Sequence, residues 1–372
     1  MMTDQANVWR NEELAVFRLR SLYRGRGYAP YKMSKFEEYD LYARNKHFLV
    51  SENVITFTDT NGKLMALKPD VTLSIIKNTK DAAGELQKLY YDENVYRVSK
   101  GTRAFRELMQ VGLECIGDVD DYCVCEVLSL AADSLAEISA DYVLDVSDLS
   151  LLGAVMEDLQ VNEAAKAELL HCIGEKNLHG VREIARREGA NEEALAKLCT
   201  LVGYDLPLAA GVDALRSELP EYEKQIAHLA NICRALGAKA DKMRLDFSVV
   251  NDMSYYNGIV FKGFVNGVPA GVLSGGQYDG LMQKMGRSAR AIGFAVYLDL
   301  LERFGATAPE FDVDAVLLYR DGCDMMALVA AAETLRAQNK CVTVCKKMPE
   351  GLKCKELLVF ENGEVKTLET NA

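Results

Sequence analysis

The chain has 372 residues, of which 49% are hydrophobic and 26% are charged, so it has the composition of an ordinary globular protein with two or three domains. Its 43 basic and 55 acidic residues give a formal net charge of −12, which disfavours general nucleic-acid binding because the overall field repels a polyanion. No apolar stretch reaches the roughly 18–20 residues that span a bilayer, and segment 1–10 is polar, unlike a signal peptide. We therefore expect a cytoplasmic protein that does not associate with membranes.

The cysteines and histidines do not form a recognisable metal site. The ten cysteines include two close pairs, Cys123/Cys125 and Cys341/Cys345, which lack the two-residue spacer of a zinc knuckle. The four histidines are not spaced with cysteine or carboxylate as a ligand set. We therefore expect free thiols, and neither a metal nor a cofactor.

The first forty residues predict a helix that leads into a loop. Leu14, Phe17 and Leu22 lie among charged residues in a helical pattern, and Gly27 and Pro30 end it.

Three Asn-Gly dipeptides lie between strand-like segments. Asn and Gly accept the positive φ angles of a tight hairpin turn, so each dipeptide predicts two antiparallel strands. The paired segments are 54–59 with 63–67 around Asn61-Gly62, 258–265 with the residues from Val268 around Asn266-Gly267, and 357–360 with 365–368 around Asn362-Gly363. Antiparallel pairing is therefore expected to dominate the main sheet.

The segment between about 151 and 239 is rich in Ala, Leu and Glu, and predicts an all-helical insertion. Strand-like alternation resumes at 244–249, so the insertion interrupts one sheet domain. We expect the sheet domain to comprise 1–150 and 241–305, with the insertion at 151–240.

The C-terminal segment predicts a small separate module at 311–372. Residues 304–309 resemble a linker. After them, strand-like 313–318, a helix at about 325–338 and strand-like 341–344 form a β-α-β unit.

Four short stretches combine polar residues and glycines in ways that a core does not require. In the first, 67–72, the side chains of Asp70 and Thr72 can jointly accept hydrogen bonds from an ammonium group. Alternatively, Asp70 caps a helix that begins near Val71.

The second stretch is a basic loop at 96–106 that leads into a predicted strand. Gln110, Gly112 and Glu114 share one face of that strand, with a gap left by the glycine. This face is either the floor of a polar binding site or a solvated outer face of the sheet.

The third and fourth stretches are 254–258 and 273–280. Their glycines permit close backbone approach, and their tyrosines offer flat walls with a terminal hydroxyl, which suits a small polar ligand. Turns with packed aromatic side chains are the alternative.

Together and in this order, the four stretches resemble the catalytic domain of class II aminoacyl-tRNA synthetases, specifically the histidyl-tRNA synthetase family, over about residues 5–305. The matching motifs are Ala66–Thr72 for L-R-P-E/D-x-T, Arg106–Glu114 for R-x-F-x-Q-x-G-x-E, Tyr255-Tyr256 for the paired tyrosines, and Gly275–Leu281 for G-G-R-Y-D-G-L. The resemblance implies an α+β fold, in which helices flank an antiparallel sheet that carries a helical insertion and a small α/β C-terminal module.

The departures from that family concern cations, which adenylation needs to neutralise the phosphates of ATP. Arg97 matches the first arginine of the motif 2 loop, but the carboxylate of R-x-E is Ser99. The remaining arginine positions hold Asn251, Gln277 and Leu300. The pattern implies that amino-acid binding is kept while ATP chemistry is lost, and that the chain has no catalytic residues.

The C-terminal module resembles the start of the family's anticodon-binding domain but is shorter, so no tRNA is expected. A chain with these departures resembles the regulatory subunit of ATP phosphoribosyltransferase, which pairs with a short-form catalytic subunit at the first step of histidine biosynthesis. The resemblance implies that histidine binds here for feedback inhibition, and that the chain supports activity of the catalytic subunit as a homodimer within a hetero-oligomer.

The resemblance also implies how histidine is held. Asp70 and Thr72 are expected to accept hydrogen bonds from the ligand ammonium. Gln110 is expected near the ligand carboxylate, with which Arg97 pairs.

Glu114 and Tyr256 are expected to bracket the imidazole nitrogens, and Tyr278 to form a wall. The full set of implied histidine-binding residues is Asp70, Thr72, Arg97, Gln110, Glu114, Tyr255, Tyr256 and Tyr278.

Two other functions remain open at this stage. A divergent histidyl-tRNA synthetase or amino-acid-activating ligase would use Lys68, Arg103 or Arg106 in place of the missing cations. A synthetase-derived sensor with a different partner is the third alternative.

Overall fold

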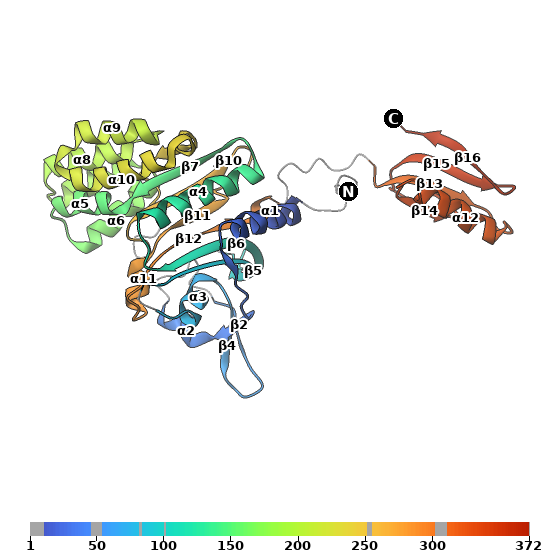
Figure 1. Ribbon diagram of the computed structural model, residues 1–372, viewed down its shortest axis with the longest axis horizontal. Helices are drawn as coiled ribbons and strands as arrows, with labels where there is room; N and C mark the ends of the chain where they lie inside the picture. Colours follow the sequence, from blue (N-terminus) through green and yellow to red (C-terminus); the bar gives the residue numbers. More distant parts are fainter. Residues whose placement is uncertain are drawn as a thin grey trace. The chain divides into compact units, whose positions relative to one another are not determined.

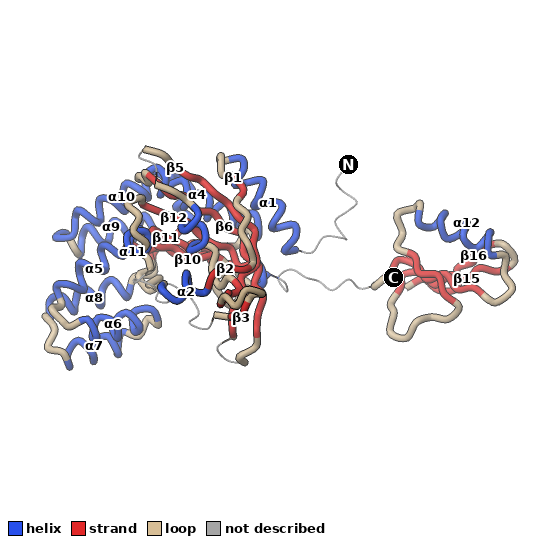
Figure 2. Tube along the Cα trace, turned by 90° about the horizontal axis from the view of Figure 1, so that it is seen from below, coloured by secondary structure: helices blue, strands red, loops and turns tan. Residues whose placement is uncertain are grey.

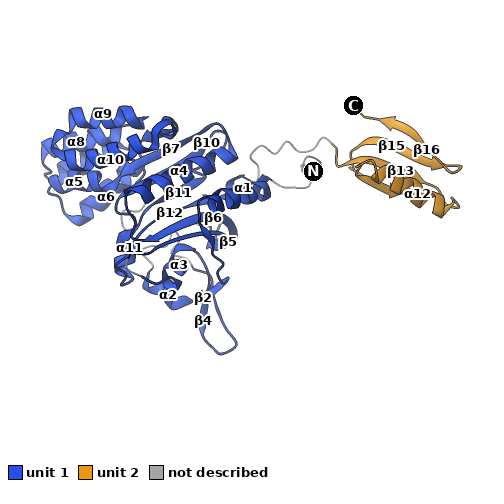
Figure 3. Cartoon of the chain, in the orientation of Figure 1, with its two compact units in different colours: residues 1–305 blue, residues 306–372 orange. Residues whose placement is uncertain are grey.

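The computed structural model describes residues 11–45, 54–81, 84–99, 102–250, 255–301 and 311–371. The chain divides into two compact units, Met1–Gly305 and Ala306–Ala372 (Figure 3). All ten cysteines are free thiols, as expected. Among the described residues, no helix is both long and apolar enough to cross a bilayer, and no group of His, Cys, Asp and Glu side chains is arranged to hold a metal ion.

A nine-stranded sheet organises the larger unit. Its order is β1-β5-β6-β12-β11-β10-β7-β9-β8. The strands are β1 (Ala29–Pro30), β5 (Leu86–Val98), β6 (Phe105–Gly117), β7 (Tyr142–Asp148), β8 (Leu206–Pro207), β9 (Met243–Leu245), β10 (Ile259–Val265), β11 (Leu273–Gln277) and β12 (Arg290–Tyr297). In the described part of the chain, six of its eight strand pairs are antiparallel, which confirms the expected dominance of antiparallel pairing.

Two helices, α1 (Asn11–Gly25) and α4 (Asp121–Ile138), cover one face of this sheet (Figure 1). The predicted N-terminal helix is thus confirmed, and it buries Leu19 and Tyr23 in the main core. Helix α4 begins where the Asp120 side chain accepts a hydrogen bond from the Cys123 N–H, which satisfies one of the free donors of its first turn.

The opposite face of the sheet has a second, smaller core. It involves a three-stranded sheet, β2-β4-β3, and short helices. These elements are β2 (Phe36–Glu38), α2 (Tyr39–Arg44), β3 (Thr56–Thr58), β4 (Leu64–Leu67), α3 (Thr72–Asn78) and α11 (Asp279–Lys284). Strands β3 and β4 form the first predicted hairpin, with Gly62 at a positive φ of 82° in its turn. A 3₁₀ helix, Leu298–Leu301, follows β12.

Helices follow β7 and gather beyond β10 and β11, on the side away from β5 and β6 (Figure 2). They are α5 (Leu149–Asp158), α6 (Glu163–Gly174), α7 (Leu178–Arg187), α8 (Glu192–Gly203), α9 (Leu208–Glu218) and α10 (Glu223–Leu236), with 3₁₀ turns at Pro220–Tyr222 and Gly237–Lys242. The side chains of Asn162, Asn177 and Asn191 cap α6, α7 and α8. The prediction that this segment is all-helical is wrong in one detail, because Leu206 and Pro207 add a strand that pairs with β9.

Two strand boundaries differ from the prediction. The strand predicted at 244–249 ends at Leu245, because the Asp246 carboxylate accepts a hydrogen bond from the Ser248 N–H, 2.8 Å away, and turns the chain. The partner of β10 begins at Leu273, opposite Gly263, and not at Val268. Pro269, which has no N–H to donate to a ladder, lies in the intervening segment 268–272.

The smaller unit is a four-stranded sheet, β14-β13-β15-β16, with one helix packed on it. Its elements are β13 (Val313–Tyr319), α12 (Met325–Arg336), β14 (Val342–Cys345), β15 (Cys354–Glu361) and β16 (Glu364–Thr370). Parallel pairing of β13 with β14 across α12 confirms the predicted β-α-β unit. Asn362 and Gly363, with φ of 53° and 83°, form the turn of the last predicted hairpin.

A buried ion pair joins Lys68, which directly follows β4, to Glu93 on β5 of the main sheet. Lys68 is fully buried, and its ammonium lies 2.5 Å from the Glu93 carboxylate. The Glu93→Ala variant should lose about 3–5 kcal/mol of unfolding free energy because it leaves a buried charge unpaired. Lys68→Met combined with Glu93→Ala should recover much of that loss.

Urea unfolding of the three proteins measures these differences. Glu163→Ala serves as the control, because Glu163 pairs with Lys166 but is largely exposed, so its removal should cost little. A double variant no more stable than Glu93→Ala would contradict the prediction.

Candidate functional site

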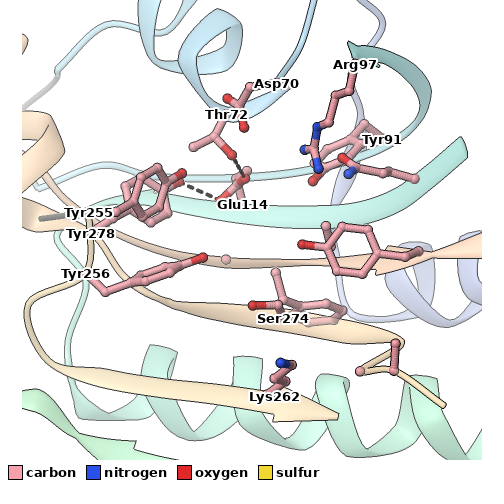
Figure 4. Close-up of a pocket in the computed structure, with 17 residues that line it drawn as sticks. Asp70, Thr72, Tyr91, Arg97, Glu114, Tyr255, Tyr256, Lys262, Ser274 and Tyr278 are labelled. Atoms are coloured by element: carbon pink, nitrogen blue, oxygen red, sulfur yellow. Dashed lines mark hydrogen bonds between the residues drawn. The ribbon is translucent and has the colours of Figure 1, made fainter. Parts of the chain in front are cut away.

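A cavity of about 440 Å³ opens on the sheet face opposite α1 and α4 (Figure 4). Strands β5, β6, β10, β11 and β12 contribute to its lining, as does the start of α3. All the residues implied by the sequence line it: Asp70, Thr72, Arg97, Gln110, Glu114, Tyr255, Tyr256 and Tyr278. The structure therefore brings the four sequence stretches together in one place.

Two glycines on neighbouring strands make room for side chains in this cavity. Gly293 on β12 lies directly opposite Glu114 on β6, and a Cβ at Gly293 would be 1.8 Å from the Glu114 carboxylate. Gly276, opposite Gly293 on β11, would place a Cβ 2.8 Å from the Tyr256 ring. Real Cβ atoms do not approach so closely, so the position of both side chains depends on these glycines.

The predicted gap at Gly112, the third glycine of the cavity floor, is occupied. The space that Gly112 leaves between Gln110 and Glu114 is not open. Tyr91 of β5 pairs with Gly112, and its hydroxyl would be 2.4 Å from a Cβ there. The face of β6 is therefore the floor of a cavity, but a tyrosine from the adjacent strand fills the predicted gap.

Glu114 is 2% exposed, and both of its carboxylate oxygens are hydrogen-bonded. The Thr72 hydroxyl donates to Oε1 over 2.8 Å, and the Tyr278 hydroxyl donates to Oε2 over 2.6 Å (Figure 4). Tyr278 thus orients the carboxyl group, in addition to forming the predicted wall.

Burial has the largest effect on the pKa values of the Glu114 and Asp70 carboxyl groups. It raises the pKa of Glu114 to about 8, against the lowering effect of the hydrogen bonds from Tyr278 and Thr72 and with a further increase from Asp70. Burial also raises the pKa of Asp70, opposed by its hydrogen bond from the Leu73 N–H and by Arg97. A cationic group bound between these carboxyl groups would offset the cost of their charge.

Asp70 both bonds to the start of a helix and lines the cavity. Its Oδ1 accepts a hydrogen bond from the Leu73 N–H over 2.9 Å, which caps the start of α3, and the residue also lines the cavity. The tyrosines behave similarly. Tyr255 packs against Tyr256 and Tyr278 with ring centroids 4.5 and 5.7 Å away, so the aromatic cluster is also part of the wall.

Several lining residues were missed by the sequence analysis. They are Tyr91, Lys262, Ala270, Gly271, Ser274, Gly293, Phe294, Ala295 and Tyr297. The two-residue strand period would have grouped some of them within each strand, but the register that places them beside Glu114 is set by pairing between distant strands.

Comparisons with known proteins identify the family. Residues 4–301 match the family model described as histidyl-tRNA synthetase. An ATP phosphoribosyltransferase regulatory subunit from Moorella thermoacetica is 30% identical over 306 residues, which cover 77% of this chain and 76% of that protein. The chain belongs to the family of ATP phosphoribosyltransferase regulatory subunits, which are histidyl-tRNA synthetase-like.

Solved structures confirm the fold that the family implies. A regulatory subunit/histidyl-tRNA synthetase from Bacillus halodurans superposes with a TM-score of 0.71 at 23% identity, covering 90% of this chain and 88% of that one. A chain of the ATP phosphoribosyl transferase (HisG:HisZ) complex from Thermotoga maritima gives 0.61 at 17% identity, covering 76% and 96%. The predicted class II synthetase-like α+β fold is therefore confirmed.

In this family member, several positions that carry a charged residue in synthetase motifs have other roles. The Gln277 side chain accepts a hydrogen bond from the Ile259 N–H over 2.8 Å and so joins β11 to β10. Leu300 packs against the main hydrophobic core. The backbone N–H of Ser99 bonds to the Ala104 carbonyl and closes the β5–β6 hairpin. Asn251 lies outside the described residues.

The raised pKa of Glu114 predicts a pH-dependent stability. Between its ordinary pKa of 4.5 and about 8, the folded state holds a proton that the unfolded state has lost, so this group lowers stability as pH rises through that range. Glu114→Gln should remove this contribution. Its unfolding free energy relative to wild type should therefore increase from about pH 5.5 to about pH 9.

Urea unfolding of both proteins at the two pH values tests this expectation. Glu107→Gln, on an exposed part of the same strand, is the control and should show a constant difference. A constant difference for Glu114→Gln as well would show that Glu114 does not carry the shift.

Proposed function

We propose that this chain binds histidine in the cavity around Glu114 and conveys feedback inhibition to the catalytic subunit of ATP phosphoribosyltransferase. The observation that carries the proposal is the pair of carboxyl groups, Asp70 and Glu114, whose charge is disfavoured by burial and which line one cavity with hydroxyl groups. A ligand with an ammonium group and a second polar nitrogen group complements this arrangement.

The ammonium group of histidine fits beside Asp70 and Thr72. The Thr72 hydroxyl already donates to Glu114, but its lone pairs still accept hydrogen bonds. Glu114 and the Tyr256 hydroxyl can each engage one imidazole nitrogen. At the other end of the ligand, Arg97 and Gln110 provide donors for the carboxylate.

The cations that an amino-acid-activating ligase would need are engaged elsewhere. Lys68 is buried in its ion pair with Glu93. Arg106, with 59% of its side chain exposed, lies 3.7 Å from Asp299. Neither these two nor Arg103 is among the described residues that line the cavity. We therefore favour a non-catalytic subunit over the ligase alternative, and no tRNA as a ligand.

The names of the relatives support a catalytic subunit of ATP phosphoribosyltransferase as the partner of this chain. The Moorella thermoacetica relative is a regulatory subunit of ATP phosphoribosyltransferase, and the Thermotoga maritima neighbour comes from such a complex. By analogy we infer that this chain assembles with a catalytic subunit, as a homodimer within a hetero-oligomer. Histidine can transmit inhibition only by binding the inhibited arrangement better than the active one, a coupling of typically about 1–3 kcal/mol.

Isothermal titration with histidine tests the ligand. We expect a dissociation constant on the order of micromolar that is unchanged by ATP, since Asn251, Gln277 and Leu300 stand where the synthetase motifs have arginines for the triphosphate. Glu114→Gln should abolish measurable binding, whereas the Glu107→Gln control should bind like wild type. Tight binding that requires ATP would instead support the ligase, as would ATP–pyrophosphate exchange in the presence of histidine.

Reconstitution with the catalytic subunit tests the regulation. Wild type should raise the activity of that subunit, and histidine should then inhibit the complex. Complexes with Glu114→Gln should keep the activation but lose sensitivity to histidine, because the substitution removes the carboxylate that engages the ligand while the side chain keeps its length and shape. If histidine inhibited both complexes equally, the cavity would not be the regulatory site.

A further inference from the structure

The cavity has two ends of different chemistry. Asp70 and Glu114 are the carboxylates among its described lining residues, and both lie on the side of β6 and α3. Lys262 and Ser274, on β10 and β11, line the other end (Figure 4). The first end suits a cationic group, and the second presents a cation and a hydroxyl.

The strand register places small residues between the carboxyl end and the lysine end of the cavity. Lys262 pairs with Ser274, Ser274 with Ala295, and Ala295 with Gly112. These residues form one row on the cavity side of four neighbouring strands, so Lys262 lies three strand spacings of about 4.8 Å from Gly112. Ser274 and Ala295 have small side chains and line the cavity, while the Tyr91 ring lies over Gly112 at the other end of the row.

The backbone of segment 268–272 supports the lysine. A Cβ at Gly271 would lie 2.5 Å from Lys262 Cε and 3.0 Å from its Cγ, so the glycine allows the chain to pack directly on the aliphatic stem. The ammonium lies 5.5 Å from the centroid of the Phe264 ring. Within the described parts of the chain it forms no ion pair with a carboxylate, so its donors are free for a ligand.

We propose that Lys262 and Ser274 form an oxyanion subsite at the end of the cavity opposite Asp70. The proposal deepens the proposed function, on which it rests for the identity of the ligand at the carboxyl end. The oxyanion is a phosphate group of a second ligand, because the α-carboxylate of histidine shares a carbon with the ammonium held at Asp70 and Thr72 and therefore stays at that end of the cavity. The phosphate oxygens would accept hydrogen bonds from the Lys262 ammonium and from the Ser274 hydroxyl, which also interacts with Tyr297.

Titrations of wild type and Lys262→Met test the subsite. The probes are inorganic phosphate with and without L-histidine, L-histidine itself, and histamine, which keeps the ring and the ammonium but has no carboxylate. Wild type should bind phosphate, Lys262→Met should bind it about tenfold more weakly or not at all, and the two proteins should bind L-histidine equally. Weaker L-histidine binding by Lys262→Met with unchanged histamine binding would place the amino-acid carboxylate at Lys262 and overturn the proposal.

Lys242→Met is the matched control, because the Lys242 ammonium also lies over an aromatic ring, at 5.7 Å from the centroid of Tyr142, but outside the cavity. Lys262→Arg should retain most of the binding. The proposal is overturned if Lys262→Met binds all three probes as wild type does, or if wild type binds none of them. Should wild type bind neither L-histidine nor histamine, the proposed function fails, whereas phosphate binding that is lost only in Lys262→Met would still support the subsite.

Discussion

The Glu114 carboxyl group lies over Gly293 in the middle of an antiparallel sheet, with Thr72 and Tyr278 each donating a hydrogen bond to it. Such a group is costly to bury unless its oxygens are satisfied, so three distant segments must meet at one point. The register of β6 against β12 supplies the space, the start of α3 supplies the threonine, and the residue after β11 supplies the phenol. The same packing of these three segments therefore forms both the cavity and the second core around it.

The residues that line the cavity and the residues at the arginine positions of the synthetase motifs differ in how they are tied to the fold. Glu114, Thr72 and Tyr278 hydrogen-bond to one another inside the core, so they cannot be exchanged singly without leaving a buried polar group unpaired. Gln277 and Leu300, by contrast, have local roles: Gln277 bonds to the Ile259 N–H, and Leu300 packs against the hydrophobic core. A chain of this family can therefore lose cations at these positions and keep its fold.

The sequence predicted those parts of the structure that depend on local chemistry. The Asn-Gly turns, the N-terminal helix and the β-α-β unit follow from φ preferences and apolar spacing, which act over a few residues. The motifs also identified the polar residues of the cavity. Local patterns could not predict which side chains occupy the floor of the cavity. Tyr91 lies over Gly112, and Lys262 lies at the far end, because of pairing between strands as distant in sequence as β6 and β12.

Four glycines of the larger unit each face one particular side chain: Gly112 faces Tyr91, Gly276 faces Tyr256, Gly293 faces Glu114 and Gly271 faces Lys262. At each pair the volume removed from one residue is occupied by the other. At Gly112, Gly276 and Gly293 backbone carbonyl oxygens crowd the same space, so a side chain there is excluded even if its partner is shortened. At Gly271 only Lys262 is near, so a larger residue there is compatible with a shorter side chain at position 262, and replacements at these two positions are epistatic.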